Sequence, residues 1–154
     1  MTVSALRVLV DADACPVKDE ALEIARRFEA ELVLVSNGGM RPSRYPGARI
    51  VVVSAGADAA DDWIAAEAGD KDVVVTADIP LAARALERGA AVINPNGRPF
   101  TAESIGTALS MRAFNQHLRE TGESRGLNAA FTGADRARFR GQLDLALRRL
   151  AQVT

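Results

Sequence analysis

The chain has 154 residues, a mass of 16.3 kDa, a formal net charge of -1, 48% hydrophobic and 25% charged residues. These values are typical of one globular domain with a sizeable core, and they exclude disordered, fibrous and low-complexity proteins. The only cysteine, Cys15, excludes an intrachain disulfide and a four-cysteine zinc site, and the apolar run 3–10 is too short for a membrane span or a secretory signal. The sequence therefore predicts a cytoplasmic protein with no membrane association.

Short apolar runs alternate with helical patterns in the first hundred residues, which is typical of a parallel sheet covered by helices on both faces. Five strands are predicted, at 6–10, 31–35, 49–53, 72–76 and 90–93. Three helices are predicted between them, from Pro16 to about residue 30, at 59–68 and at 80–88. The segment 36–47 contains three glycines and two prolines, so we expect an irregular loop there.

The remaining third of the chain, 101–154, carries only helical patterns. Thr101 is expected to cap one helix, and Thr132 with Asp135 three residues later is expected to open another. In that last helix, Phe139, Leu143 and Leu147 recur at helical spacing, which predicts a packing face. The predicted fold class is therefore α/β, in one domain over 1–154, with the sheet core in 1–100 and a helical cover in 101–154.

Polar side chains stand at the expected carboxyl ends of the strands, where open α/β sheets bind their ligands. They are Asp11, Asp13, Ser36, Asn37, Ser54, Asp78, Asn94 and Asn96. Asp58, Asp61 and Asp62 open the helix before the fourth strand, and helical spacing lets at least one of them face the same edge.

Carboxylates that converge repel one another unless a hard cation lies between them. The cluster therefore predicts one or two Mg²⁺ or Mn²⁺ ions and metal-assisted phosphate chemistry. The expected ligands are Asp11, Asp13, Asp61, Asp62 and Asp78.

Aspartate is also a favoured helix cap after a strand, and this simpler interpretation fits some of the set. Asp78 precedes Ile79 and Pro80, and Asp58 precedes the second helix, so each alone is readily interpreted as a cap. Asp11 and Asp13 are harder to explain as caps, because at least one of these two carboxylates at the strand end is expected to face a buried layer, where a charge without a partner is costly.

Residues 11–18, DADACPVK, resemble the opening motif of the YaiI/YqxD family of bacterial proteins. Four further segments resemble blocks of that family, so that the resemblance covers nearly the whole chain: GADAADDWI at 56–64, TADIPL at 76–81, NPNGRPF at 94–100 and FTGADRARF at 131–139. The wider relatives of the family are PIN-like nucleases. The resemblance implies a PIN-like three-layer fold and a metal-dependent nuclease, acting on RNA rather than DNA, with Asp11, Asp61, Asp62 and Asp78 as catalytic metal ligands.

Several basic and amide side chains are expected near the same edge, where they would contact a nucleic-acid backbone. They are Lys18, Asn37, Arg41, Arg44, Asn94 and Arg98. Residues 101–154 hold 8 Arg against 5 Asp and Glu, so Arg136, Arg138 and Arg140 are either further backbone contacts or an ordinary solvated face.

Two other functions stay open at the level of the sequence. The chain also fits a haloacid-dehalogenase-like phosphohydrolase, with Asp11 as nucleophile, Asp13 as acid and Ser36 as its second position, although the later motifs of that class are not evident. It fits equally a PIN-like module with a weakened site that binds RNA or a partner protein.

Overall fold

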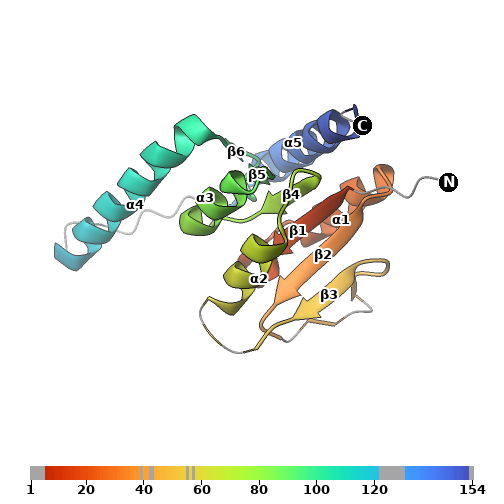
Figure 1. Ribbon diagram of the computed structural model, residues 1–154, viewed down its shortest axis with the longest axis horizontal. Coiled ribbons are helices and arrows are strands. Elements are labelled where there is room, and N and C mark those ends of the chain that lie inside the picture. Colours follow the sequence, from red (N-terminus) through yellow and green to blue (C-terminus); the bar gives the residue numbers. More distant parts are fainter. Residues whose placement is uncertain are drawn as a thin grey trace.

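The computed structural model of the chain describes residues 6–38, 40–41, 44–54, 56, 58–121 and 131–152, with the side chains of 14 and 112–121 left out. Its centre is one sheet in the order β3-β2-β1-β4-β5-β6 (Figure 1). The strands are β1 (Arg7–Asp11), β2 (Glu31–Ser36), β3 (Arg49–Val52), β4 (Asp72–Val75), β5 (Ala91–Ile93) and β6 (Pro99–Phe100). The first five strands are parallel and β6 is antiparallel to β5, which confirms the predicted mostly parallel α/β fold.

Strand β6 was not predicted from the sequence. It has only two residues and begins with Pro99, which lacks the amide proton that a central strand must donate. At the edge of a sheet a proline is tolerated, and β6 occupies that edge. A two-residue strand carries too little hydrophobic pattern to be recognised from sequence.

Helices cover both faces of the sheet, and the strand residues alternate between the two resulting cores. On one face, α1 (Lys18–Arg27) and α5 (Gly133–Gln152) pack against Val8 and Val10. On the other, α2 (Ala59–Glu67) and α3 (Ile79–Glu87) pack against Leu9. Because all three strand residues are fully buried, β1 carries an unbroken apolar run.

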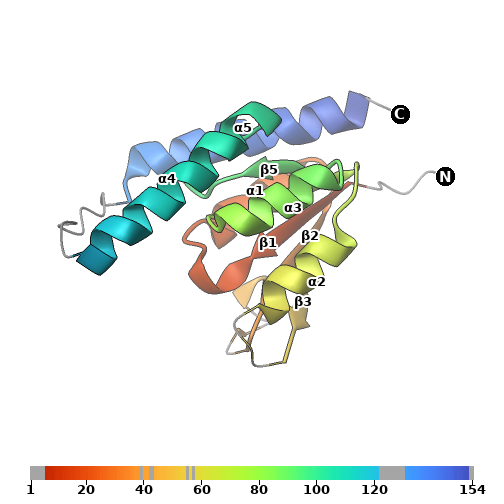
Figure 2. The same ribbon diagram turned by 60° about the vertical axis from the view of Figure 1, so that its left-hand side comes forward.

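The last helix forms part of the core. Phe139, Leu143 and Leu147 of α5 are all fully buried, which confirms the predicted packing face. Helix α4 (Ala102–Thr121) differs from the expected cover, because it packs on α3 only near its start and then extends away from the sheet (Figure 2). Over the described residues, none of the helices combines the length and apolarity needed to cross a membrane.

Both predicted caps of the C-terminal helices are present. The Thr101 hydroxyl accepts a hydrogen bond from the Ser104 amide at 3.0 Å, and the Ser104 hydroxyl oxygen accepts one from the Thr101 amide at 2.8 Å. Thr132 and Asp135 form the same reciprocal pair, at 3.2 and 2.9 Å. These bonds satisfy amide groups that the first turn of a helix leaves without partners.

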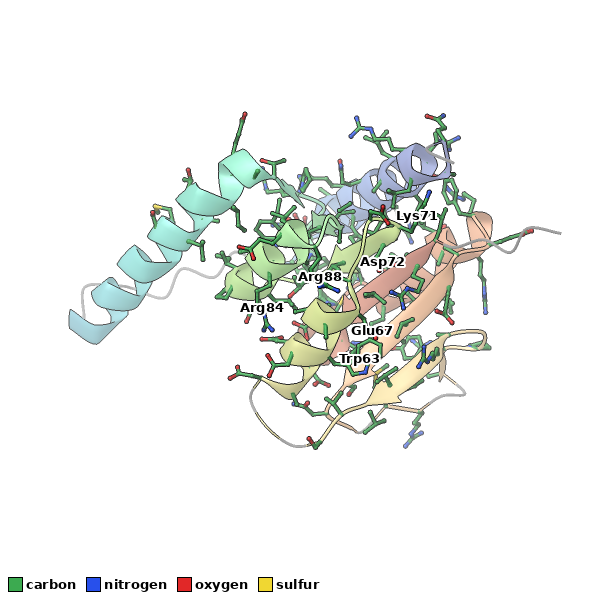
Figure 3. All side chains as sticks on the ribbon, in the orientation of Figure 1. Trp63, Glu67, Lys71, Asp72, Arg84 and Arg88 are labelled. Atoms are coloured by element: carbon green, nitrogen blue, oxygen red, sulfur yellow. The ribbon has the colours of Figure 1, made fainter. Side chains whose placement is uncertain are left out.

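A charged network closes the amino-terminal edge of the sheet. The guanidinium of Arg7 donates two hydrogen bonds to Asp72, at 2.9 and 2.8 Å, and a third to the Glu67 carboxylate at 3.2 Å. Asp72 also accepts from the Gly69 amide at 2.9 Å, and its side chain is only 3% exposed. Figure 3 shows Glu67 and Asp72 where α2 ends and β4 begins. The buried carboxylate is thus fully compensated.

Candidate functional site

Asp11 and Asp78 come together at the carboxyl-terminal edge of the sheet because β1 and β4 are adjacent parallel strands. Asp11 ends β1, and its Oδ2 accepts a hydrogen bond from the Thr76 hydroxyl at 3.0 Å. The same hydroxyl oxygen accepts from the Asp78 amide at 3.0 Å. Thr76 is buried, so it acts as a fixed link between the two aspartates. Thr76 is not among the site residues that the sequence predicts, and the only signal for it is its position two residues before Asp78.

The third carboxylate of this cluster is Asp61, in the first turn of α2. Burial and then the charges of Asp78, Asp11 and Asp58 raise its pKa to about 6, against the lowering effect of Arg84. Burial also raises the pKa of Asp11, assisted by the charges of Asp78 and Asp13 and opposed by the Thr76 hydrogen bond. Such mutual repulsion arises only between nearby charges, so the structure brings Asp11, Asp61 and Asp78 together.

Asp78 begins helix α3. Its Oδ1 accepts a hydrogen bond from the Leu81 amide at 2.9 Å, which makes it the N-cap of α3. The capping interpretation is therefore confirmed for Asp78, while Oδ2 makes no hydrogen bond within the described part of the chain. Asp58 occupies the N-cap position of α2, but its side chain forms no capping hydrogen bond.

The donor chemistry of the cluster fits a hard divalent cation, since all of its groups are carboxylates. One oxygen each of Asp11 and Asp78 and both oxygens of Asp61 make no hydrogen bond among the described residues. Within that same part of the chain, no three acidic, histidine or cysteine side chains stand close enough together to hold a metal ion. Repulsion acts over longer distances than coordination, so unneutralised carboxylates are expected to stay further apart than ligands would.

Asp62 points away from the cluster, although the sequence placed it there beside Asp61. Its Oδ1 accepts a hydrogen bond from Arg84 of α3 at 2.9 Å, and its side chain is 65% exposed. Consecutive residues on a helix point about 100° apart, so only one of the pair can face the sheet edge. The structure selects Asp61.

Asp13 also differs from its expected role as a metal ligand. After β1 the chain makes a 3-10 turn, η1 (Ala12–Ala14), which directs Asp13 toward β2. Its Oδ1 accepts from the Ser36 hydroxyl at 2.6 Å and its Oδ2 from the Asn37 amide at 2.9 Å. Gly38 follows with a φ of 132°, a conformation that glycine adopts easily. Asp13 and Asn37 together anchor the loop after β2.

Three predicted cations line one cleft beside this anchor. The cleft has a volume of about 400 Å³ and is lined by Ala12, Asp13, Lys18, Gly38, Met40, Arg41, Arg44 and Tyr45. Lys18 donates to the carbonyl oxygens of Ala12 and Cys15, at 3.0 and 2.8 Å, and Arg44 pairs with Asp19 at 3.1 Å. The guanidinium of Arg41 has no partner among the residues that the structure describes.

The turn between β5 and β6 holds the remaining predicted contacts. Asn94 Oδ1 accepts from the Asn96 amide at 2.9 Å, and Asn96 Oδ1 accepts from the Arg98 amide at 3.0 Å, so the asparagines shape the turn. At Gly97 an added Cβ would lie 2.5 Å from the Arg138 carbonyl carbon, so only glycine fits there. Arg98 remains exposed at the same edge, on the far side of β4 from the cleft.

The three arginines at the start of α5 all form ion pairs with carboxylates of the same chain. Arg136 donates to Glu20 at 2.9 Å, Arg138 to Asp135 at 3.0 Å and Arg140 to Glu23 at 2.9 Å. Arg136 and Arg138 each also bond a backbone carbonyl, of Pro16 and Asn96. This pairing favours the interpretation of these arginines as an ordinary solvated face over nucleic-acid contacts.

The chain is similar to proteins from several bacteria. It is 63% identical to UPF0178 protein mlr0875 of Mesorhizobium japonicum over 142 residues, which cover 92% of each chain. It is 57% identical to a UPF0178 protein of Parvibaculum lavamentivorans over 89% of this chain and 90% of the other, and 54% identical to UPF0178 protein Atu1478 of Agrobacterium fabrum over 94% of both.

No solved structure matches the chain. The model of an uncharacterised bacterial family, YaiI/YqxD, matches residues 9–149. The matched residues include Asp11, Asp61 and Asp78. The match confirms the resemblance to this family that the motifs carry. The chain belongs to the YaiI/YqxD family.

Proposed function

We propose that this protein is a divalent-metal-dependent nuclease that hydrolyses phosphodiester bonds, with RNA preferred to DNA, at Asp11, Asp61 and Asp78. The observation that carries the proposal is the gathering of these three carboxylates from β1, α2 and the turn before α3 at one edge of the sheet. The resemblance to PIN-like nucleases points to these three positions and to Asp62. Asp62 is left out, because its carboxylate is paired with Arg84.

Each of the three side chains is supported by a rigid element, as a site that must hold a fixed geometry requires. Thr76 orients Asp11 through a 3.0 Å hydrogen bond, and the cap of α3 orients Asp78. Asp61 stands on α2, whose Ile64 is buried in the core one turn later. A bound Mg²⁺ or Mn²⁺ would neutralise the carboxylates and supply water for in-line attack at phosphorus. Asp11, Asp61 and Asp78 would thus hold the positive charge of the cation next to the phosphodiester backbone of the substrate.

The haloacid-dehalogenase alternative receives less support from the same geometry. In that reaction Asp13 would have to donate a proton to the leaving group. Both of its oxygens instead accept hydrogen bonds, from Ser36 and Asn37. Ser36 is fully buried, so its hydroxyl is not open to a phosphate.

Metal binding is tested by thermal melts in EDTA and in millimolar Mn²⁺. Mn²⁺ is expected to raise the Tm of the wild type, because a ligand that binds only the folded state stabilises it. The increase should be lost in Asp11→Asn and Asp61→Asn and retained in Asp62→Asn, which is a matched control on the same helix. A wild-type Tm that ignores Mn²⁺, or an equal response in Asp61→Asn and Asp62→Asn, would contradict the proposed site.

Catalysis is tested with end-labelled single-stranded RNA and DNA of the same sequence. We expect cleavage that requires Mn²⁺ or Mg²⁺, is faster on RNA and is abolished by Asp11→Asn. A Mn²⁺-dependent Tm increase without cleavage of the RNA or the DNA would argue for a binding module and against the nuclease.

A further inference from the structure

The cleft between the turn after β1 and the loop after β2 is mainly cationic on one side. Three of its lining side chains are cationic, Lys18, Arg41 and Arg44, against the single carboxylate of Asp13. Each oxygen of that carboxylate already accepts one hydrogen bond, from Ser36 and from the Asn37 amide. The cleft therefore presents an excess of positive charge next to a group of fixed hydrogen bonds.

The other side of the cleft is apolar and held in place. Met40 and Tyr45 line it and are half-buried, because both pack against the core formed with α1 and α5. The guanidinium of Arg44 lies 5.4 Å from the centre of the Tyr45 ring, a cation–π contact. A flat ring and a thioether beside cations are suited to a ligand with one aromatic and one anionic part.

We propose that this cleft binds one nucleotide of a single-stranded nucleic acid, with its base against Met40 and Tyr45 and its phosphate against Arg41 and Lys18. The volume of about 400 Å³ suits one nucleotide and lies in the lower part of the range of small-molecule sites, roughly 300–1,000 Å³. A base inside a duplex cannot reach the cleft without leaving its stack, so the cleft selects single strands.

The cations have hydrogen-bonding capacity left for a phosphate. Lys18 uses two of its three ammonium protons on Ala12 and Cys15, which leaves one donor. Arg41 has no side-chain partner in the described residues, so its whole guanidinium can form a bidentate pair. A phosphate bound by Lys18 and Arg41 would break no salt bridge among the residues that the structure describes.

This inference rests on the proposed nuclease only for the use to which the nucleotide is put. Asp13 lines the cleft, and its charge is close enough to Asp11 to help raise the pKa of that carboxyl, so the cleft lies beside the proposed site. The cleft would then hold the nucleotide next to the bond that is cut. Binding itself requires no metal and no catalysis.

The test uses the full chain in EDTA, with a fluorescently labelled six-nucleotide RNA followed by anisotropy at low salt. Arg41→Gln is expected to weaken binding about tenfold, since a charge-assisted bidentate pair is lost. Arg44→Gln should weaken it by a smaller factor. The same RNA annealed to its complement should bind more weakly than the single strand.

Arg148→Gln is the matched control for Arg44→Gln. Arg148 is 58% exposed, pairs with Asp144 at 2.8 Å and lies 5.6 Å from the Phe28 ring, while Arg44 is 62% exposed and makes the same two kinds of contact. Arg148 lies against Phe28, at the opposite end of α1 from Lys18. Its replacement should therefore not change the affinity for RNA.

Equal affinities for wild type and Arg41→Gln, or equal binding of single and double strands, would overturn the proposal. Tight metal-free binding that Arg41→Gln weakens, in a protein that never cleaves RNA, would support the cleft and reject the nuclease. Mn²⁺-dependent cleavage by the wild type, with RNA binding unchanged in Arg41→Gln, would support the nuclease and reject the nucleotide-binding cleft.

Discussion

The two edges of the sheet treat their carboxylates in opposite ways. At the amino-terminal edge, Asp72 is almost completely buried but receives two hydrogen bonds from Arg7, which raises the pKa of that guanidinium. At the carboxyl-terminal edge, Asp11 and Asp61 are only half-buried, yet no arginine or lysine of the described residues hydrogen-bonds to either. A buried structural carboxylate requires compensation of its charge, whereas carboxylates with raised pKa values and no cationic hydrogen-bond partner are typical of functional sites.

The largest effect is expected at the compensated edge. Arg7→Met removes the partner of a buried carboxylate and should lower the free energy of unfolding by about 3 kcal/mol. Urea denaturation at pH 7 measures this loss. The double variant Arg7→Met/Asp72→Asn should recover much of it, because the uncompensated charge is gone. A loss below about 1 kcal/mol would show that Asp72 is well solvated, and the contrast between the edges would fail.

At the uncompensated edge, removal of charge should stabilise the metal-free protein. Asp61 has its pKa raised from 3.8 to about 6, so its ionised form destabilises the fold. This penalty is absent below about pH 4, develops between pH 4 and 6 and is complete above pH 6. Asp61→Asn should therefore raise the free energy of unfolding at pH 7.5 by about 1 kcal/mol, after allowance for solvent screening of a partly exposed group.

Denaturation in EDTA at pH 4 and pH 7.5 checks this sign. The difference between Asp61→Asn and wild type should vanish at pH 4. A variant that is less stable than wild type at pH 7.5 would mean that Asp61 is compensated after all.

A smaller effect is expected at Asp78, where capping and repulsion oppose each other. Asp78→Ala loses a cap worth about 1 kcal/mol but also relieves repulsion from Asp11 and Asp61, so a net loss of about 0.5 kcal/mol is expected without metal. Asp78→Asn keeps the cap and should be neutral or stabilising. Thermal melts of both variants in EDTA separate the two terms, and equal destabilisation by Asn and Ala would remove repulsion from the explanation.

The smallest effect is expected on the surface of α5. Arg140 and Glu23 form an ion pair in which both side chains are nearly half exposed, at 45% and 46%. Arg140→Gln should leave the free energy of unfolding almost unchanged. Anisotropy with the same RNA should be unchanged too. A loss of RNA affinity would return the α5 arginines to the nucleic-acid surface.

Much of the fold could be predicted from local pattern. Buried parallel strands such as β1 and β2 carry continuous apolar runs, and α5 repeats its apolar residues at helical spacing. Caps such as Thr101 and Thr132 are local signals as well, because each bonds to an amide three residues away. The position of Asp11 and Asp78 at one edge followed from the parallel sheet, since all its carboxyl ends share one side.

Direction and pairing of side chains were decided by the tertiary structure. The sequence does not distinguish Asp61 from Asp62 as a site residue. The packing of α2 against α3 pairs Asp62 with Arg84, whereas Asp61 faces the sheet edge. Asp13 is as close to Asp11 in sequence as a ligand would be, but the 3-10 turn after β1 directs it to Ser36. Sequence spacing determines which residues reach an edge, whereas contacts between distant segments determine which charges are neutralised there, because a salt bridge depends on distance in space and not along the chain.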